Sequence, residues 1–160
     1  MDKTTGFIRE NVSVLHQRII GITKWLIVND DTQSFNIGYF GFGVSAAAAL
    51  AAAAIRPDAI LAIVAVDPRI DLVSSYLPRV VARTLLIAAE RNTQALDMSR
   101  KATAELASDT TLDNVRETRE RGLVYTLEVI PGVANVFENE KSLQDVEQLA
   151  IWWFTSYLSV

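Results

Sequence analysis

One stretch of the chain, from Ala59 to Val66, contains only apolar residues and is rich in β-branched side chains. Such a run is typical of a parallel strand that is covered on both faces of its sheet. Asp67-Pro68 ends the run. We therefore expect a sheet with helices packed against its two sides.

The rest of the sequence alternates between helical and strand-like patterns. From Ile8 to Val28 apolar residues recur every three or four positions, which indicates an amphipathic helix that ends near Asn29. The apolar positions of this helix are Ile8, Val12, Leu15, Ile19, Ile22 and Leu26. The other expected elements are a strand at 36–40, a helix at 45–55, a strand at 59–66, a short helix at 72–76, a strand at 84–89, a helix from 94 to at least 107 and a strand at 123–130. The charged segment 109–121 either extends the preceding helix or forms a second piece before Gly122.

A last helix is predicted from the capping pattern Ser142-x-x-Asp145. The residues expected on its buried side are Val146, Leu149, Ala150, Trp153, Phe154 and Tyr157. Alternating strands and helices predict a three-layer α/β fold with a mainly parallel sheet, whose four strands lie in sequence order. The whole chain, 1–160, fits a single domain. In such a sheet the site forms in the loops after the strands, here 41–44, 67–71, 90–93 and 132–140.

The composition excludes several classes of function. Half of the residues are hydrophobic, 21% are charged and the net charge is -4, which describes a soluble globular protein without the basic stripe of a nucleic-acid-binding one. The absence of cysteine excludes thiolate metal sites, and the single His16 makes a histidine-built zinc site within one chain implausible. No apolar run is long enough to cross a bilayer and the first ten residues do not resemble a secretory signal. We expect a cytoplasmic protein that uses no cofactor or metal and does not bind nucleic acid or membrane.

The segment Gly41-Phe42-Gly43-Val44-Ser45 lies between the first strand and an alanine-rich helix. It matches a nucleophile elbow of the form Gly-x-Ser-x-Gly, except that Gly43 occupies the position of the serine. Ser45 lies two positions further, roughly 200° around the helix, so it is expected to point away from the apex of the turn.

In this frame the chain resembles the α/β-hydrolases, and most closely their dienelactone hydrolase-like branch. The resemblance runs over most of the chain and is carried by segments 38–48, 56–59, 77–80, 84–87 and 130–138. In that family a serine follows the first of these strands, an acid follows the next strand but one, and a histidine follows the last. The three positions hold Gly43, Asn92 and Asn135 here, so the resemblance implies a degenerate triad.

The resemblance also implies a truncated fold, because the residues before Ile8 are too few for the family's first four strands. One of the two oxyanion-hole donors would be missing with them, which leaves the N–H of Val44. Some relatives carry this domain behind a phosphoribosyltransferase domain, but the sequence contains no phosphoribosyl-binding loop.

Simpler interpretations apply to the other polar and aromatic candidates. His16 is expected on the helix surface or at an interface. The carboxylates Asp67, Asp71, Glu90 and Glu138 are expected to be solvated loop ends and caps rather than a metal or acid–base cluster. The aromatic run 152–154 is expected to divide between core and interface, and the charged segment 113–121 to be a solvated face rather than a docking helix.

The main functional hypothesis is a catalytically inactive, hydrolase-like protein that acts by binding or oligomeric assembly. The alternative is a carboxylic-ester or lactone hydrolase with a non-standard site that uses Ser45 or loop carboxylates, or one that another chain completes. Under either hypothesis the candidate pocket comprises Phe42, Gly43, Val44, Asp67, Asn92 and Asn135. A homodimer is expected because strand 37–40 would be an open edge of the sheet and a single helix would cover the second face. Alternatively, the first helix could shield that second face within one chain. The candidate interface residues are Ile37, Tyr39, Trp152 and Phe154, with a protein partner or an unidentified small ligand left open.

Overall fold

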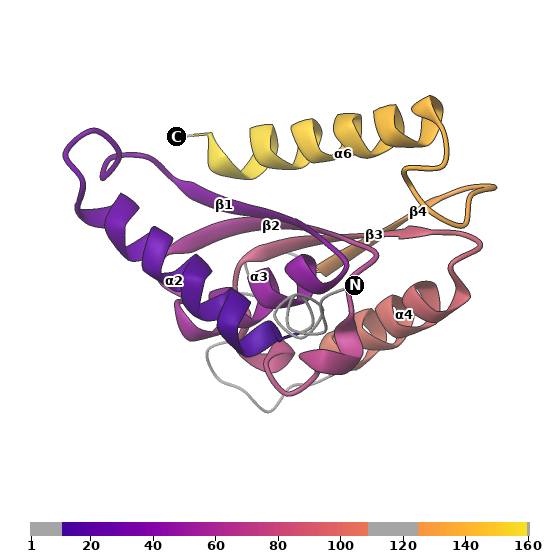
Figure 1. Cartoon of the computed structure of the whole chain (residues 1–160), viewed down its shortest axis with the longest axis horizontal. Helices are drawn as coiled ribbons and strands as arrows, with labels where there is room; N and C mark the ends of the chain where they lie inside the picture. The colour runs from indigo at the N-terminus through magenta and orange to yellow at the C-terminus, as the bar shows by residue number, and fades with distance from the viewer. Residues whose placement is uncertain (1–10, 109–124, 160) are drawn as a thin grey trace, which may run out of the picture.

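The computed structural model describes residues 11–108 and 125–159 (Figure 1). Its center is a four-stranded parallel sheet in the order β1-β2-β3-β4. The strands are β1 (Ile37–Phe42), β2 (Ile60–Val66), β3 (Arg83–Ala89) and β4 (Tyr125–Ile130). The parallel sheet and the sequential strand order that the alternating pattern predicted are therefore confirmed.

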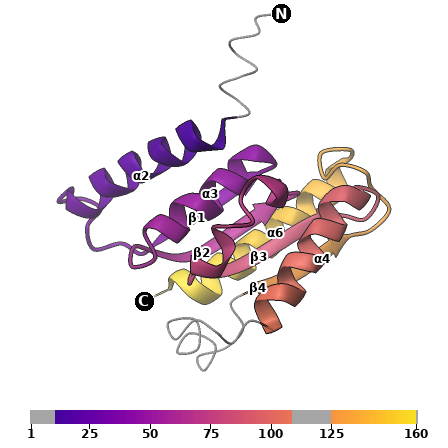
Figure 2. The same cartoon turned by 90° about the horizontal axis from the view of Figure 1, so that it is seen from below.

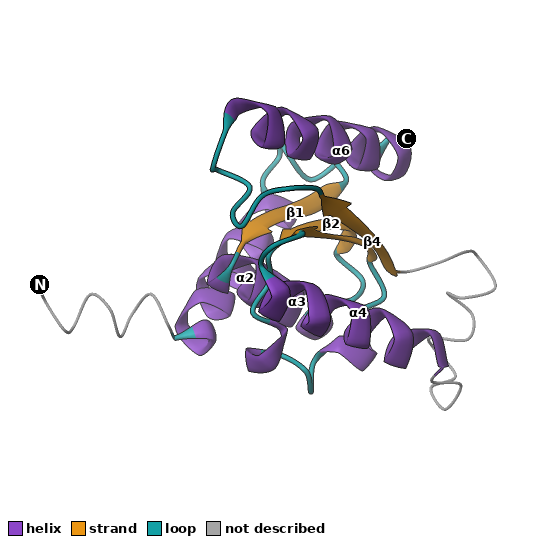
Figure 3. Ribbon diagram, turned by 90° about the vertical axis from the view of Figure 1, so that its right-hand side faces the viewer, coloured by secondary structure: helices purple, strands orange, loops and turns teal. Residues whose placement is uncertain are grey.

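Helices cover both faces of this sheet. They are α2 (Val12–Val28), α3 (Val44–Ile55), α4 (Thr93–Ser108) and α6 (Glu140–Leu158). Figures 2 and 3 show α2, α3 and α4 on one side of the sheet and α6 on the other. Right-handed crossovers explain why α3 and α4, which connect consecutive parallel strands, lie on the same face. None of the helices among the described residues is both long and apolar enough to cross a membrane.

The inner strands and the alanine helix form the core. Leu85, Leu86 and Ile87 on β3 are fully buried, because both faces of that strand are covered. Every residue of α3 from 46 to 54 is also buried, since the helix lies between the sheet and α2. Alanine suits this position because its small side chain lets neighbouring elements approach closely.

Helix α2 packs against the core through part of the predicted apolar stripe, Val12 and Ile19, but its buried side is rotated toward His16 and Thr23. Its buried residues are His16 and Thr23, whereas Ile22 is 62% exposed. The Thr23 hydroxyl donates to the carbonyl of Ile19 at 2.9 Å and lies 2.6 Å from the phenolic oxygen of Tyr39 on β1. The Thr23 hydroxyl, which donates to Ile19, can accept from the Tyr39 hydroxyl, so this contact joins the buried side of α2 to β1.

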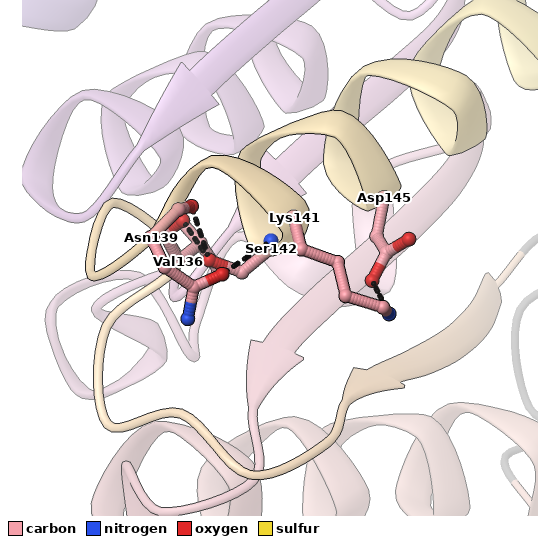
Figure 4. Close-up of polar contacts among 5 residues, drawn as sticks. All are labelled: Val136, Asn139, Lys141, Ser142 and Asp145. Atoms are coloured by element: carbon pink, nitrogen blue, oxygen red, sulfur yellow. Dashed lines mark hydrogen bonds and ion pairs between the residues drawn. The ribbon is translucent and has the colours of Figure 1, made fainter.

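The beginning of α6 also differs from the prediction (Figure 4). Asn139, not Ser142, caps the helix: its side-chain oxygen accepts from the Ser142 N–H at 2.9 Å. The Ser142 hydroxyl instead donates to the carbonyls of Val136 and Asn139, and Asp145 pairs with Lys141 at 3.1 Å. The predicted buried side of the helix is confirmed, with Val146, Ala150 and Trp153 buried.

The short helix expected at 72–76 is wrong; two 3-10 turns, Ile70–Leu72 and Leu77–Arg79, flank that segment instead. The alternatives for 109–121 lie outside the described residues, as does the start of the strand expected from 123.

Candidate functional site at the carboxyl ends of the strands

The turn from β1 into α3 has the positive-φ geometry that the elbow motif predicts. Gly43 has φ 57° and ψ -120°, a combination that glycine adopts without steric cost. Its N–H donates to the carbonyl of Val66 at 2.9 Å, and its own carbonyl accepts from the N–H of Ala47 and of Arg69. A Cβ atom placed on Gly43 would meet no heavy atom within 4 Å. The apex of the elbow is therefore open, and a side chain there would project into free space.

Gly41 lets the strand and the helix meet at this turn. A Cβ atom on Gly41 would lie 2.7 Å from the Cα of Ala46 and 2.8 Å from its nitrogen. Both of these atoms belong to the backbone of α3, so no side-chain rotation could relieve the contact. This is the role of the first glycine of an elbow, which allows strand and helix to pass at close range.

Ser45 does not point at the apex. Its hydroxyl donates to the carbonyl of Phe42 at 2.7 Å and accepts from the N–H of the same residue at 3.0 Å. These two bonds fold the side chain back onto the end of β1. A nucleophilic serine needs a base within hydrogen-bond reach of its hydroxyl, and the bonds described for Ser45 go to backbone atoms.

Asp67, which follows β2, is buried rather than solvated, so the interpretation of all four loop carboxylates as solvent-facing is wrong for this residue. It is 6% exposed and adopts φ 42°, which a non-glycine residue rarely does. Its carboxylate accepts from the N–H of Ala89 at 2.9 Å and from the side chain of Asn92. Burial raises the pKa of Asp67, and the two hydrogen bonds partly oppose that rise. The carboxylate thereby connects the end of β2 to the loop after β3.

The two asparagines at the acid and histidine positions hold their own loops in shape. The side-chain oxygen of Asn92 accepts from the N–H of Ala95 at 3.3 Å, at the start of α4. Asn135 accepts from the N–H of Phe137 at 2.8 Å and so forms a local turn. Asn92 and Asp67 are brought together, whereas the side-chain bond of Asn135 stays within its own loop.

Further contacts join the loops to one another and to the elbow. Glu90 accepts from the N–H of Gly132 at 2.6 Å, which links the loop after β3 to the turn after β4. The rings of Phe42 and Phe137 meet edge to face, with their centroids 4.7 Å apart. The elbow and the loop that carries Asn135 therefore lie side by side at this end of the sheet.

Neither a metal site nor a relocated histidine is found in this region. In the part of the chain that the structure describes, no three histidine, cysteine, aspartate or glutamate side chains are grouped to hold a metal ion. His16 is 8% exposed and its ring lies 6.0 Å from that of Tyr76 between centroids, so the predicted surface position is wrong. Among the described residues its Nδ1 has no hydrogen-bond partner.

The four candidate interface residues do not form one surface. Tyr39 is buried and Ile37 partly buried, and both pack into the core on the α3 side of the sheet. Phe154 and Trp152 belong to α6, on the opposite face. Trp152 is 52% exposed, and Phe154 packs partly into the core.

The pKa values of Asp67 and Asp71 are shifted in opposite directions, so the two residues should affect the pH dependence of stability in opposite ways. Because the native pKa of Asp67 is raised above 3.8, its contribution to the free energy of unfolding is largest below that pH and falls as the pH rises through the native pKa. The Asp71 pKa is lowered, chiefly by hydrogen bonds from Arg69, so its contribution is full above 3.8 and is lost as the pH falls. We expect the difference in unfolding free energy between wild type and Asp67→Asn to fall as the pH rises from 4 to 7. The difference between wild type and Asp71→Asn should fall as the pH is lowered from 4 to 2. Urea unfolding at each pH measures both, and slopes of the same sign would contradict the assignment.

Both the sequence and the fold are similar to those of known proteins. The sequence is 34% identical over 148 residues to a candidate phosphoribosyl transferase of Mycobacterium tuberculosis, in strain CDC 1551 / Oshkosh and in strain H37Rv. The match covers 92% of this chain but 30% of each relative, so the chain spans less than a third of their length. No protein-family model matches the chain.

The fold is similar to that of a solved structure, the dienelactone hydrolase from Anabaena variabilis ATCC 29413, with a TM-score of 0.81. The two sequences are 35% identical, and the match covers 97% of this chain and 65% of the hydrolase. The likeness extends through the elbow, because it includes nearly the whole chain. In sequence and in fold, this chain is similar to a dienelactone hydrolase, a protein of the α/β-hydrolase superfamily.

Proposed function

We propose that this chain acts by binding, and that it does not carry out the serine chemistry of the hydrolases it resembles. The observation that carries the proposal is the elbow itself, whose geometry is retained while its apex bears glycine. Gly43 has the positive φ of the turn and open space beside its Cα, but no atom that could attack a carbonyl.

The other two triad positions support the same conclusion. The amide nitrogen of Asn135 is not basic and cannot take a proton from a nucleophile. Asn92 lacks the negative charge that stabilises an imidazolium, and its side chain is already bonded to Asp67 and Ala95. In serine proteases, loss of the serine or the histidine lowers turnover on the order of a million-fold.

A second candidate function is favoured by Asp67. A buried carboxyl with a raised pKa, next to the elbow of a hydrolase fold, is the kind of group that active sites use as a general acid or base. In this alternative the chain is an ester or lactone hydrolase with a non-standard site, alone or completed by a second polypeptide. The phosphoribosyl transferase activity in the relatives' name is not part of either proposal, since the match covers 30% of those proteins.

Hydrolysis of a panel of activated aryl esters and small lactones separates the two functions. We expect the wild-type rate to equal that of buffer, and the Ser45→Ala and Asp67→Asn variants to behave identically. Turnover that survives Ser45→Ala but disappears in Asp67→Asn would establish the Asp67 enzyme. Turnover lost in Ser45→Ala would instead assign the chemistry to that serine.

Restoring the serine should not restore the chemistry. In Gly43→Ser the new hydroxyl would occupy the open apex, but the base position would still be Asn135. We expect no covalent labelling by a fluorophosphonate probe above that of wild type, measured by intact mass spectrometry. Ser45→Ala in the Gly43→Ser background is the control for labelling of the neighbouring serine. Labelling that depends on the serine at position 43 would show that a functional base is present.

A further inference from the structure

A cavity of about 390 Å³ lies between helix α4 and the two 3-10 turns that follow β2. Ile70 and Leu77 of the turns and Ala102 of α4 line it with apolar atoms, and all three residues are buried. Met98, which is partly buried, also belongs to the lining. A hollow of this size with a mainly apolar lining is typical of a site for a small molecule.

The cavity lies away from the edge of the sheet that β1 forms. Helix α4 packs on β3 and β4 (Figure 2), whereas β1 is at the other end of the strand order. The lining residues named above belong to the two turns and to α4. The hollow therefore does not depend on what lies beside β1 or α6.

Charged side chains of both signs also line the cavity. On α4 the ammonium of Lys101 lies 3.7 Å from a carboxylate oxygen of Glu105, and both side chains are mostly exposed. On the side of the turns, the Asp71 carboxylate accepts two hydrogen bonds from Arg69, at 2.8 and 2.7 Å. The charges of these four residues balance, so a ligand with a net charge gains little attraction from them. The Lys101–Glu105 pair is a dipole, however, and it attracts a ligand dipole of the opposite direction.

We propose that this cavity binds an α-amino acid with an apolar side chain, such as phenylalanine. The ammonium and the carboxylate of an α-amino acid are joined through one carbon, so they are about 3 Å apart. This separation is close to the 3.7 Å between the charges of Lys101 and Glu105. The ligand carboxylate accepts from Lys101, its ammonium donates to Glu105, and its side chain enters the apolar hollow. Each charge of the ligand then meets its opposite.

NMR of isotope-labelled methionine methyl groups tests where the ligand lies, because Met98 lines the cavity. The chain contains two methionines, and Met98→Leu identifies the signal of Met98. We expect L-phenylalanine to shift that signal and to saturate with a Kd on the order of 1 mM, since so small a ligand contributes modest affinity. Glycine, which has the same charges and no side chain, should shift it far less at the same concentration. The absence of a saturable shift, or an equal shift with glycine, would overturn the proposal.

Two analogues and one substitution test the charges. Phenylpropionate lacks the ammonium and phenethylamine lacks the carboxylate, so each should bind about fivefold more weakly than L-phenylalanine, as expected for loss of one exposed ion pair. Lys101→Gln should weaken L-phenylalanine by about the same factor and should not weaken phenethylamine. Lys141→Gln is the matched control, because Lys141 is as exposed as Lys101 and also pairs with a carboxylate four positions on, but in α6. Equal affinity for the three ligands, or equal effects of the two substitutions, would contradict the pairing.

This inference rests on the proposed binding role, for which it names the class of ligand. The ester and lactone panel on the same samples distinguishes its failure from failure of the proposed function. If phenylalanine does not shift the Met98 signal and the panel shows no turnover, the ligand is wrong and the proposed lack of chemistry stands. If phenylalanine shifts the signal and the panel shows turnover, the ligand stands and the proposed lack of chemistry is wrong.

Discussion

Gly41→Ala is expected to lower the free energy of unfolding by about 3 kcal/mol, near the upper end of what overpacking costs. The new methyl group would lie 2.7 Å from the Cα of Ala46, and the closest atoms are all backbone atoms of the following helix. Either β1 or α3 must therefore shift. Because α3 is buried along most of its length, a shift there would disturb its contacts with β1, β2 and α2. Urea unfolding followed by circular dichroism measures the loss.

Gly21→Ala is the matched control, because a Cβ atom on Gly21 would meet nothing within 4 Å. Gly21 lies inside α2, where alanine is favoured over glycine by about 0.5–1 kcal/mol. The same substitution should thus stabilise the protein at one site and destabilise it at the other. If Gly41→Ala were as stable as wild type, the close passage of strand and helix at the elbow would be wrong.

The layers and the strand order could be predicted from the sequence because burial on two faces leaves a strong pattern. The run that became β2 is apolar at consecutive positions, and its predicted boundaries differ from the observed ones by one residue at most. The elbow was predictable for a related reason. Glycine stands at both 41 and 43 between a strand and an alanine-rich helix, and the positive φ of Gly43 agrees with the elbow motif.

The orientation of α2 and the cap of α6 could not be predicted in the same way, since both depend on tertiary contacts. Thr23 faces inward because the Tyr39 hydroxyl lies beside it, and no local pattern encodes that meeting. Ser142 and Asn139 are both good capping residues. The choice between them is made by the carbonyl of Val136, which engages the Ser142 hydroxyl.

The candidate site was predicted in position but not in detail. The loops after the strands do gather at one end of the sheet, yet the burial of Asp67 was missed because it depends on Ala89 and Asn92, which are distant in sequence. The apolar flank of α6 had a weak signal. Leu143 and Ile151 widen the apolar stripe of the helix beyond the part that faces the sheet, and both side chains are exposed.

These features connect the proposed function to the packing. The polar groups that a hydrolase would direct at its substrate are used here to hold loops: Asn92 caps a helix, Asn135 closes a turn and Ser45 folds back on β1. The projecting apolar surface lies instead along α6. The proposed binding role is consistent with both observations, and the exposed surface of α6 is held in place by the attachment of this helix to the sheet.

That attachment depends most on Trp153, and Trp153→Ala is expected to lower the free energy of unfolding by about 4 kcal/mol. Trp153 is 1% exposed and packs against the apolar cluster of β2 and β3. Its indole N–H also donates to the carbonyl of Arg83 at 3.0 Å, and its ring meets that of Tyr157 at 4.6 Å between centroids. Truncation removes the packing and the hydrogen bond together and leaves a cavity under the helix.

The neighbouring Trp152 provides the control, because it has the same side chain at the next position but is 52% exposed. Trp152→Ala should change the stability by no more than about 0.5 kcal/mol, as surface substitutions usually do. Trp153→Phe separates the loss of packing from the loss of the hydrogen bond. It keeps most of the side-chain volume and loses the bond to Arg83, so it should cost about 1–2 kcal/mol. Circular dichroism, rather than tryptophan fluorescence, should follow the urea unfolding, because both substitutions alter the fluorophores. An equal loss of unfolding free energy in Trp152→Ala and Trp153→Ala would mean that Trp153 does not attach α6 to the sheet.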